Sequence, residues 1–335
     1  MISEITTHLW QSTWFAVAAA LLTLLFRSNR AQVRHWLWFS ASMKFLIPLA
    51  VLMKVGSYFA WTPVARKIAT PAVAFAVEYV SGPFTSQPSV GTPPPVPVDW
   101  RPIAIVALWL AGLIAISSLR LRNWLRIRAA VHASVPLQLE GVETRVAPGL
   151  LEPGVVGWLR PVLLLPEGIA DSLTPQQLET VLAHEMCHVR RRDNLLASIH
   201  MIVEAVFWFH PLVWWVGARL LAERERACDE EVLRLGNQPR VYADAILGVC
   251  KLYMESPLVC VAGVTGSDIR KRIEAIMLNR GVRGLSIAKR ALLAFAGLVA
   301  VAGPLAVGVV LGVGHSPAIL AQAPAALIQP LMQLA

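Results

Sequence analysis

The residues best suited to chemistry lie in residues 174–193, TPQQLETVLAHEMCHVRRRD. His184 and His188 are four positions apart, and Glu185 directly follows the first histidine. Side chains four apart on a helix stack on one face about 6 Å from each other, so both imidazoles can reach one Zn²⁺ ion. Glu185 points about 100° away, toward the water side of that ion. Zinc lowers the pKa of its bound water toward about 7, and Glu185 can accept the proton as the water attacks a peptide carbonyl.

A catalytic zinc ion needs a third protein ligand, and residues 222–236, AERERACDEEVLRLG, offer the best candidate. Their pattern predicts a long helix that ends at Gly236, with Glu225 and Asp229 one turn apart. Glu225 can bind the metal, while Asp229 can accept the N–H of a ligating histidine. Three further glutamates lie in the same stretch, so a solvated charged face is the alternative interpretation.

The two histidines are predicted to lie on a helix that begins near residue 174. Thr174 can cap its N-terminus, Pro175 suits its first position, and Gln177 completes a capping box. Apolar residues at positions 178, 181 and 182 then follow helical periodicity. One helix therefore positions both imidazoles.

A nearly continuous apolar stretch, residues 195–222, separates the two halves of the site. A single crossing of the bilayer would place the halves on opposite faces, where they could not share an ion. Pro211 splits the stretch into pieces of about 16 and 12 residues, each shorter than a span. We therefore predict a helical hairpin that dips into the inner leaflet, with His200 and Glu204 facing protein. His210 can stabilise an oxyanion or cap the second helix, and we favour capping.

The composition predicts that part of this chain lies in lipid. Of its 335 residues, 56% are hydrophobic and 15% are charged, whereas soluble proteins carry about a quarter charged residues. Four apolar runs approach the roughly 20 residues that a spanning helix needs, and they are residues 9–26, 37–60, 103–119 and 291–312. These runs predict a mainly α, multi-pass membrane protein with four transmembrane helices.

The distribution of Lys and Arg predicts the orientation of the spans. Basic residues follow the first and third runs and precede the fourth, which places the N-terminus outside. Residues 120–290 then form one cytosolic domain, residues 61–102 an extracytoplasmic Pro-rich loop, and residues 313–335 a short extracytoplasmic tail. The net charge of +9 comes mostly from Lys and Arg residues that flank the spans and set their orientation. We therefore predict no direct binding of nucleic acid. The four cysteines form no CxxC pair, which fits reduced thiols in the cytosol.

A resemblance to a known family rests on four segments, which are GVVGWLRPVLLLPEGI (154–169), LTPQQLETVLAHEMCHVRRRDNL (173–195), FWFHPLVWWVGARL (207–220) and ERERACDEE (223–231). With four spans and an outside N-terminus, they resemble the BlaR/MecR-type regulatory membrane metallopeptidases over about residues 1–312. These proteins are gluzincins, so the resemblance implies a cytosolic α+β gluzincin-type zinc peptidase domain on a bacterial inner membrane. It also implies that an extracellular signal activates this domain, which cleaves itself or a cytosolic DNA-binding repressor.

The resemblance gives each residue of the predicted site a role. It implies His184, His188 and Glu225 as ligands of one zinc ion and Glu185 as the general base. Asp229 then corresponds to the ligand-orienting acid of the family's ExxxD pattern.

The chain departs from the antibiotic sensors of this family after the fourth span. Those sensors carry a penicillin-binding domain there, whereas only residues 313–335 follow in this sequence. SIAK (286–289) matches the SxxK acylation motif, but SDN and KTG partners do not occur, so we interpret the match as a coincidence. The resemblance therefore supports the peptidase and not the sensing of β-lactams.

Strand-like runs occur in residues 137–166. In zinc peptidases of this kind an edge strand usually pairs with the extended substrate. The candidate is RPVLLLP, with Arg160, Pro161, Val162 and Leu163 at its start. A plain core strand is the alternative interpretation of the same residues.

Two more helices are predicted at residues 239–256 and 268–280. The second, around SDIRKRIEAIML, is expected to pack on the catalytic unit rather than to offer a positive patch to a repressor. The loop PLVCVAGVTG near residues 257–266 is a candidate site of self-cleavage.

These patterns favour a signal-transducing zinc protease. The alternatives are a zinc protease for quality control of membrane proteins and a non-enzymatic receptor scaffold. The predicted partners are a cytosolic DNA-binding repressor or another protein substrate, and membrane lipid. A homodimer is a further assembly that the sequence leaves open.

Overall fold

The computed structural model describes residues 2–59, 100–137, 142–148, 152–255, 266–278 and 284–311. It divides into two compact units. The first unit contains residues 1–47 and 100–289, and the second contains residues 48–99 and 290–335. Nearly all of the predicted extracytoplasmic loop, the predicted tail and the candidate self-cleavage loop lie outside the described residues.

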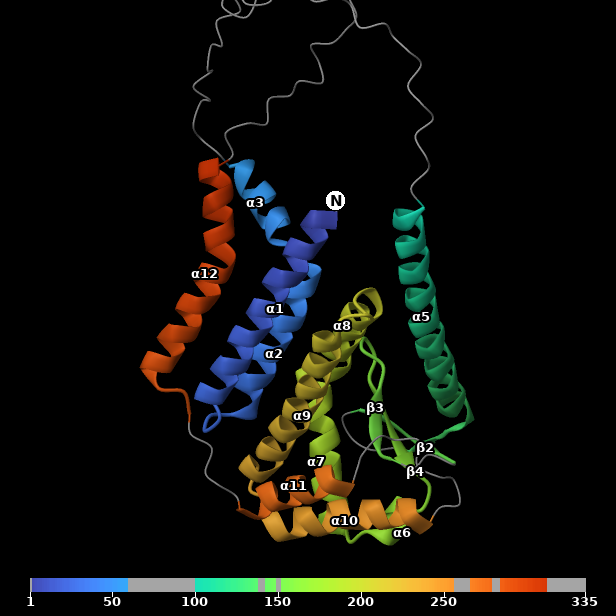
Figure 1. Cartoon of the computed structure of the whole chain (residues 1–335). Helices are drawn as coiled ribbons and strands as arrows, with labels where there is room; N and C mark the ends of the chain where they lie inside the picture. Colours follow the sequence, from blue (N-terminus) through green and yellow to red (C-terminus); the bar gives the residue numbers. More distant parts are fainter. Residues whose placement is uncertain are drawn as a thin grey trace, which may run out of the picture. The chain divides into compact units, whose positions relative to one another are not determined.

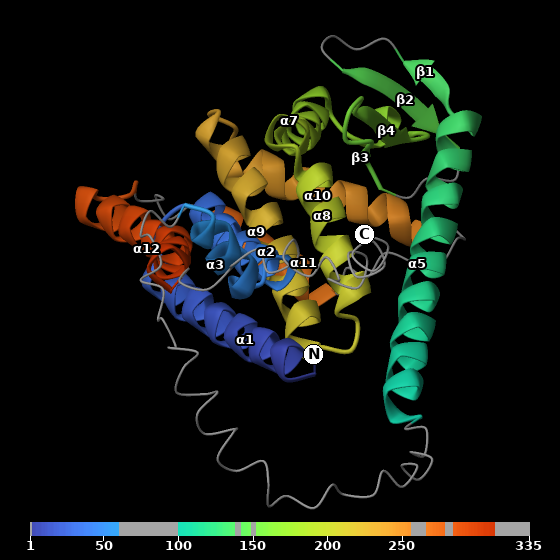
Figure 2. The same ribbon diagram turned by 90° about the horizontal axis from the view of Figure 1, so that it is seen from above.

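Helices make up most of the first unit (Figures 1 and 2). In chain order they are α1 (Ile2–Leu25), α2 (Ala31–Leu46), α5 (Arg101–Ala133), α6 (Ile169–Ser172), α7 (Pro175–Arg191), α8 (Asp193–Val206), α9 (Pro211–Arg234), α10 (Pro239–Glu255) and α11 (Gly266–Leu278). The second unit contains α3 (Leu49–Ser57) and most of α12 (Ile287–Leu311).

Three helices of the described residues, α1, α5 and α12, are long and apolar enough to cross a membrane. A fourth candidate span arises if the bent pair α2 and α3 counts as one. The run predicted over residues 37–60 is thus two helices, because Pro48 lacks an N–H and cannot continue the first. The run predicted over residues 103–119 is part of a 33-residue helix. The chain is a mainly helical membrane protein, and four spans with an outside N-terminus stay a prediction.

A small sheet lies beside α7. Its strands are β1 (Val135–Leu137), β2 (Glu143–Ala147), β3 (Gly154–Val156) and β4 (Val162–Pro166), in the order β1-β2-β4-β3. β4 pairs in parallel with β2 and antiparallel with β3, so both of its edges are occupied.

This topology corrects the predicted substrate-pairing strand. Val162 and Leu163 lie in β4, which has no free edge to offer to an extended peptide. Arg160 and Pro161 lie in the turn between β3 and β4 and belong to neither strand. Leu163 is buried in the core, so the alternative interpretation, a core strand, is the right one.

The helix α7 is held between the sheet and α10. Leu163 and Leu165 of β4, Val181 of α7 and Ala245 of α10 are buried together in one apolar cluster. The predicted capping box is present, because Thr174 accepts a hydrogen bond from the backbone N–H of Gln177, whose side chain accepts one from the N–H of Thr174. The prediction for the start of this helix is therefore confirmed.

Helices α8 and α9 form a hairpin that packs against α2 (Figure 1). Pro211 occupies the first turn of α9, as expected for a break at this residue. His200 is buried and shares a 2.8 Å hydrogen bond with Ser42 of α2, and Glu204 forms an ion pair with Arg120 of α5. His200 and Glu204 therefore both face protein, as predicted.

His210 stands at the N-cap position of α9, but its side chain makes no capping hydrogen bond. Its ring instead packs edge-on against Phe45 at a centroid distance of 5.4 Å. The predicted capping role is thus wrong for the side chain. Proline at the first helical position removes one of the orphan N–H groups that a cap would otherwise serve.

Candidate metal centre

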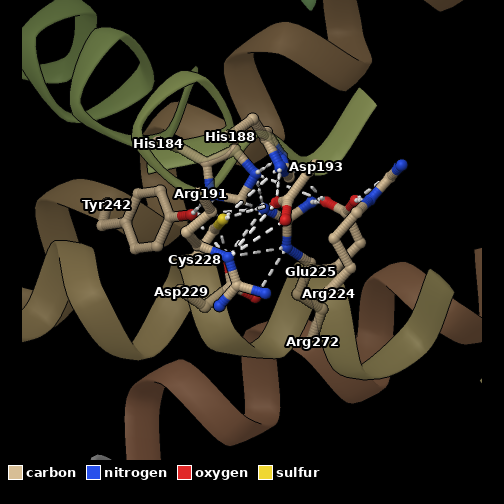
Figure 3. A network of polar contacts seen from close by, with 10 residues as sticks. All are labelled: His184, His188, Arg191, Asp193, Arg224, Glu225, Cys228, Asp229, Tyr242 and Arg272. Carbon is tan, nitrogen blue, oxygen red and sulfur yellow. Dashed lines mark hydrogen bonds and ion pairs between the residues drawn. The ribbon is translucent and has the colours of Figure 1, made fainter. Parts of the chain in front are cut away.

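Three donor atoms meet where α7 crosses α9. The Nε2 atoms of His184 and His188 lie 3.1 Å apart. Glu225 Oε2 lies 3.3 Å from His184 Nε2 and 3.8 Å from His188 Nε2. Figure 3 shows the three side chains pointing toward one another from their two helices. The structure therefore brings the predicted ligands together, although Glu225 lies 41 residues from His184 along the chain.

The spacing of these atoms fits a zinc ion. Four ligands at about 2.0–2.1 Å in tetrahedral geometry are separated from each other by about 3.3 Å. The three measured separations, 3.1, 3.3 and 3.8 Å, bracket this value. Converging lone pairs repel one another unless a cation lies between them, so this donor set suits a small divalent metal.

A buried carboxylate orients His188. Its Nδ1 donates a 2.8 Å hydrogen bond to Oδ2 of Asp193, the first residue of α8. Arg192, in the left-handed conformation at φ 54°, is the single residue between α7 and α8. Arg191 donates to both oxygens of Asp193 and fixes the carboxylate. With Nδ1 protonated, the Nε2 lone pair of His188 faces the other two donors.

His184 is oriented through a tyrosine. Its Nδ1 lies 2.9 Å from the hydroxyl of Tyr242 on α10, and this hydroxyl donates a 2.5 Å hydrogen bond to Asp229 Oδ1. The direct distance from His184 Nδ1 to Asp229 Oδ1 is 3.4 Å. Asp229 therefore lies where the sequence predicts, but the Tyr242 hydroxyl stands between it and the histidine.

The carboxylate of Glu225 is held in place by the cationic side chain of Arg224. Arg224 donates to Oε1 of Glu225 at 3.1 and 3.0 Å, which leaves Oε2 facing the imidazoles. Burial would raise the pKa of Glu225, but the contact with His184 and the nearby cationic groups hold it well below its usual value. Burial would also lower the pKa of His188, but the bond to Asp193 and the carboxylates of Glu225 and Glu185 raise it.

Glu185 is buried, with 7% of its surface exposed. Its charge acts on His188, and it also acts on Glu152, a half-buried residue just before β3. Burial, and then repulsion from Glu225 and Glu185, raise the pKa of Glu152. The predicted general base therefore lies among the charged groups of the centre.

The structure separates His210 from this centre. His210 precedes Glu225 by fifteen residues on one helix, which corresponds to about 22 Å at 1.5 Å per residue. It cannot stabilise an oxyanion formed beside Glu225, and this candidate role is withdrawn.

Three residues that sequence reasoning missed complete the centre: Asp193, Tyr242 and Arg272. Asp193 closes the quoted histidine stretch, and a carboxylate in the turn after a ligand helix is a signal that could have been used. Tyr242 and Arg272 lie 58 and 88 residues beyond His184 and follow no spacing rule. Cys228 is also close, with Sγ 3.4 Å from His188 Nδ1.

Apolar helices able to cross a membrane, joined to a histidine–glutamate centre of this geometry, are the arrangement expected of a membrane-associated peptidase. The chain belongs to the BlaR1 peptidase M56 family, whose model matches residues 7–276. The family resemblance seen in the sequence is therefore confirmed.

Individual relatives match a smaller part of the chain. It is 28% identical over 151 residues to regulatory protein BlaR1 of Bacillus licheniformis, which covers 44% of this chain and 25% of that protein. It is 24% identical over 132 residues to methicillin resistance mecR1 protein of Staphylococcus aureus, covering 38% and 22%. Protease HtpX homolog 2 of Methanosarcina acetivorans is 32% identical over 107 residues, covering 31% and 36%. The matches thus span about a quarter of the regulatory proteins' length.

Proposed function

We propose that this chain is a zinc endopeptidase whose single metal ion is held by His184, His188 and Glu225. The observation that carries the proposal is the convergence of their three donor atoms within 4.8 Å of one another. When bound, the zinc ion supplies a water molecule of lowered pKa. Glu185 accepts the proton of that water and delivers it to the leaving nitrogen of the peptide bond.

The metal content of the purified full-length protein tests this proposal. We expect one zinc ion per chain in the wild type, loss of zinc in Glu225→Ala, and retention of zinc without peptide hydrolysis in Glu185→Gln. A wild-type chain that binds no zinc would contradict the enzyme and leave the receptor scaffold as the better interpretation.

An extended substrate needs a free strand edge with which to pair, and we propose that β3 provides this edge. Among the described strands, β3 lies at one end of the sheet and packs against α7, which carries the histidines. Asn194 of α8 donates to the carbonyl of Val155 at 2.7 Å and of Gly157 at 3.2 Å. An extended substrate that pairs with β3 competes with this amide for the same carbonyl groups.

We propose that the centre lies on the cytosolic side, with the α8–α9 hairpin in the inner leaflet of a bacterial inner membrane. The convergence of α7 and α9 supports this, because one metal ion requires both helices on the same face of the bilayer. Single cysteines in place of Arg190 and Arg226 should react with an impermeant thiol reagent from the same side. Labelling from opposite sides would contradict the arrangement.

We further propose that cleavage transduces a signal, with the chain itself or a cytosolic DNA-binding repressor as the substrate. The similarity to regulatory protein BlaR1 supports this role. The similarity to protease HtpX homologs favours a second candidate, a general protease for membrane proteins. A Glu185→Ala strain separates the two, since a signalling protease changes a defined set of transcripts, whereas a general protease changes the abundance of many membrane proteins.

A further inference from the structure

The guanidinium of Arg272, on α11, lies against the metal centre (Figure 3). Its Nε and Nη2 atoms donate to the two oxygens of Asp229 at 2.8 and 2.7 Å. Nη2 also lies 3.2 Å from the hydroxyl of Tyr242 and 3.2 Å from Nε2 of His184. This two-point contact fixes the plane of the guanidinium, since a planar fork that meets a carboxylate with two donors has little freedom to rotate.

One end of this guanidinium makes only a long ion pair with a described residue. A guanidinium has five N–H groups, and the three on Nε and Nη2 are those that face Asp229, Tyr242 and His184. Nη1 makes no hydrogen bond to any residue that the structure describes, and it lies 3.8 Å from Oε2 of Glu225. That oxygen is the one that faces both histidines. Two N–H donors are therefore held beside the proposed metal ligands with no hydrogen bond to a described residue.

We infer that Arg272 binds the carbonyl oxygen of the scissile peptide bond through Nη1 and stabilises the oxyanion that forms there. This inference rests on the proposed peptidase function. As the water oxygen bonds to the carbonyl carbon, Glu185 takes the water proton and the carbonyl π electrons move to the oxygen. The oxygen gains a full negative charge, and fixed donors next to it stabilise the transition state more than the ground state.

Charge and access both suit this role. Burial would lower the pKa of Arg272, but the carboxylates of Asp229 and Glu225 raise it, so the side chain is cationic at every relevant pH. The side chain is partly exposed, with 27% of its surface accessible to solvent. Arg224 contacts Oε1 of Glu225, the oxygen that faces away from the histidines, whereas Arg272 lies beside Oε2, the oxygen that faces them.

A purely structural role for Arg272 predicts different results. If it only neutralises Asp229, its loss frees Tyr242 and Asp229 to move, and the orientation of His184 suffers. Zinc would then dissociate faster, while the turnover of each chain that still holds zinc would be unchanged. Zinc content and turnover per bound zinc therefore distinguish the two roles.

The experiment compares full-length wild type, Arg272→Ala and Arg272→Lys with Arg270→Ala, in detergent, on a pool of quenched fluorescent peptides. Arg270 is the matched control, because it lies on the same helix with its side chain 82% exposed and paired with Glu274. We expect both Arg272 variants to retain zinc, to lose about 10²–10³-fold in kcat with little change in KM, and to bind a phosphinic peptide correspondingly weakly. Added methylguanidinium should restore part of the activity of Arg272→Ala.

Turnover per bound zinc that equals the wild type in Arg272→Ala would overturn the inference and leave the peptidase intact. A phosphinic peptide that binds wild type and Arg272→Ala equally well would also overturn it. A wild-type protein that holds zinc but cleaves no peptide in the pool would overturn the proposed function itself.

Discussion

Replacing Tyr242 by phenylalanine removes one oxygen atom from between His184 and Asp229. Tyr242 is 1% exposed, and the ring packs with Val232, Ala243 and Ile276. Phenylalanine keeps that ring, so the change is confined to the hydroxyl. Asp229 retains its bonds from Arg272, whereas the Nδ1–H of His184 loses its acceptor.

The size of the effect follows from two independent quantities. A buried donor left without an acceptor costs about 1–3 kcal/mol. Loss of a partner that orients a metal ligand lowers metal affinity about 10–100-fold, which corresponds to about 1.4–2.7 kcal/mol. The two ranges agree, and because His184 is a proposed ligand we expect the cost to appear in zinc affinity.

The assay is the transfer of zinc from the purified protein to a chromogenic chelator. We expect Tyr242→Phe to bind zinc 10–100-fold more weakly than wild type, with helical content unchanged. Tyr58→Phe is the matched control, because Tyr58 is 76% exposed and lies in the other unit. Equal zinc affinity in Tyr242→Phe and wild type would refute the idea that His184 is oriented through this hydroxyl.

Three further predictions use other parts of the molecule. The apparent affinity for zinc should fall as pH drops below the raised pKa of His188, because protons compete with the metal for its imidazole. Glu225, whose pKa is lowered, stays ionised there, and an affinity that is flat down to pH 5 would contradict this. Gly217→Ala should lower the melting temperature, since its Cβ would lie 2.5 Å from His200 Nε2 and 2.6 Å from Glu204 Oε1; Gly297→Ala, with open space at its Cβ, should not. Asn194→Ala should change KM more than zinc content, and loss of zinc instead would show that Asn194 serves the metal centre.

Local patterns predicted the ligand-bearing part of the centre well. The capping box at Thr174 fixed the start of α7, and helical spacing then placed His184 and His188 on one face. Glu225 was reached because a zinc site requires a third ligand and the next charged helix offered one. The first two steps use residues within one or two turns, where helical geometry decides the outcome, whereas the third relies on the coordination chemistry of zinc.

The parts that escaped prediction depend on tertiary contacts. Tyr242 comes from α10 and Arg272 from α11, and neither residue type has a spacing rule that links it to a zinc ligand. The position of β4 was left open between a substrate-pairing edge and a core strand, although VLLLP is a continuous apolar run of the kind that indicates a strand buried on both faces. His210 was misjudged because a residue before proline looks like a cap whether or not its ring turns toward the backbone.

The junction at Arg192 has a mechanical consequence. A single residue offers only φ and ψ to absorb a rotation between the helices on either side of it. Asp193 is the first residue of α8, so a tilt of this helix turns the Asp193 carboxylate. The 2.8 Å hydrogen bond from His188 to Asp193 passes that rotation to the imidazole. Movement of the hairpin would therefore change the orientation of His188, so a displacement among apolar helices would reach a proposed ligand of the metal centre.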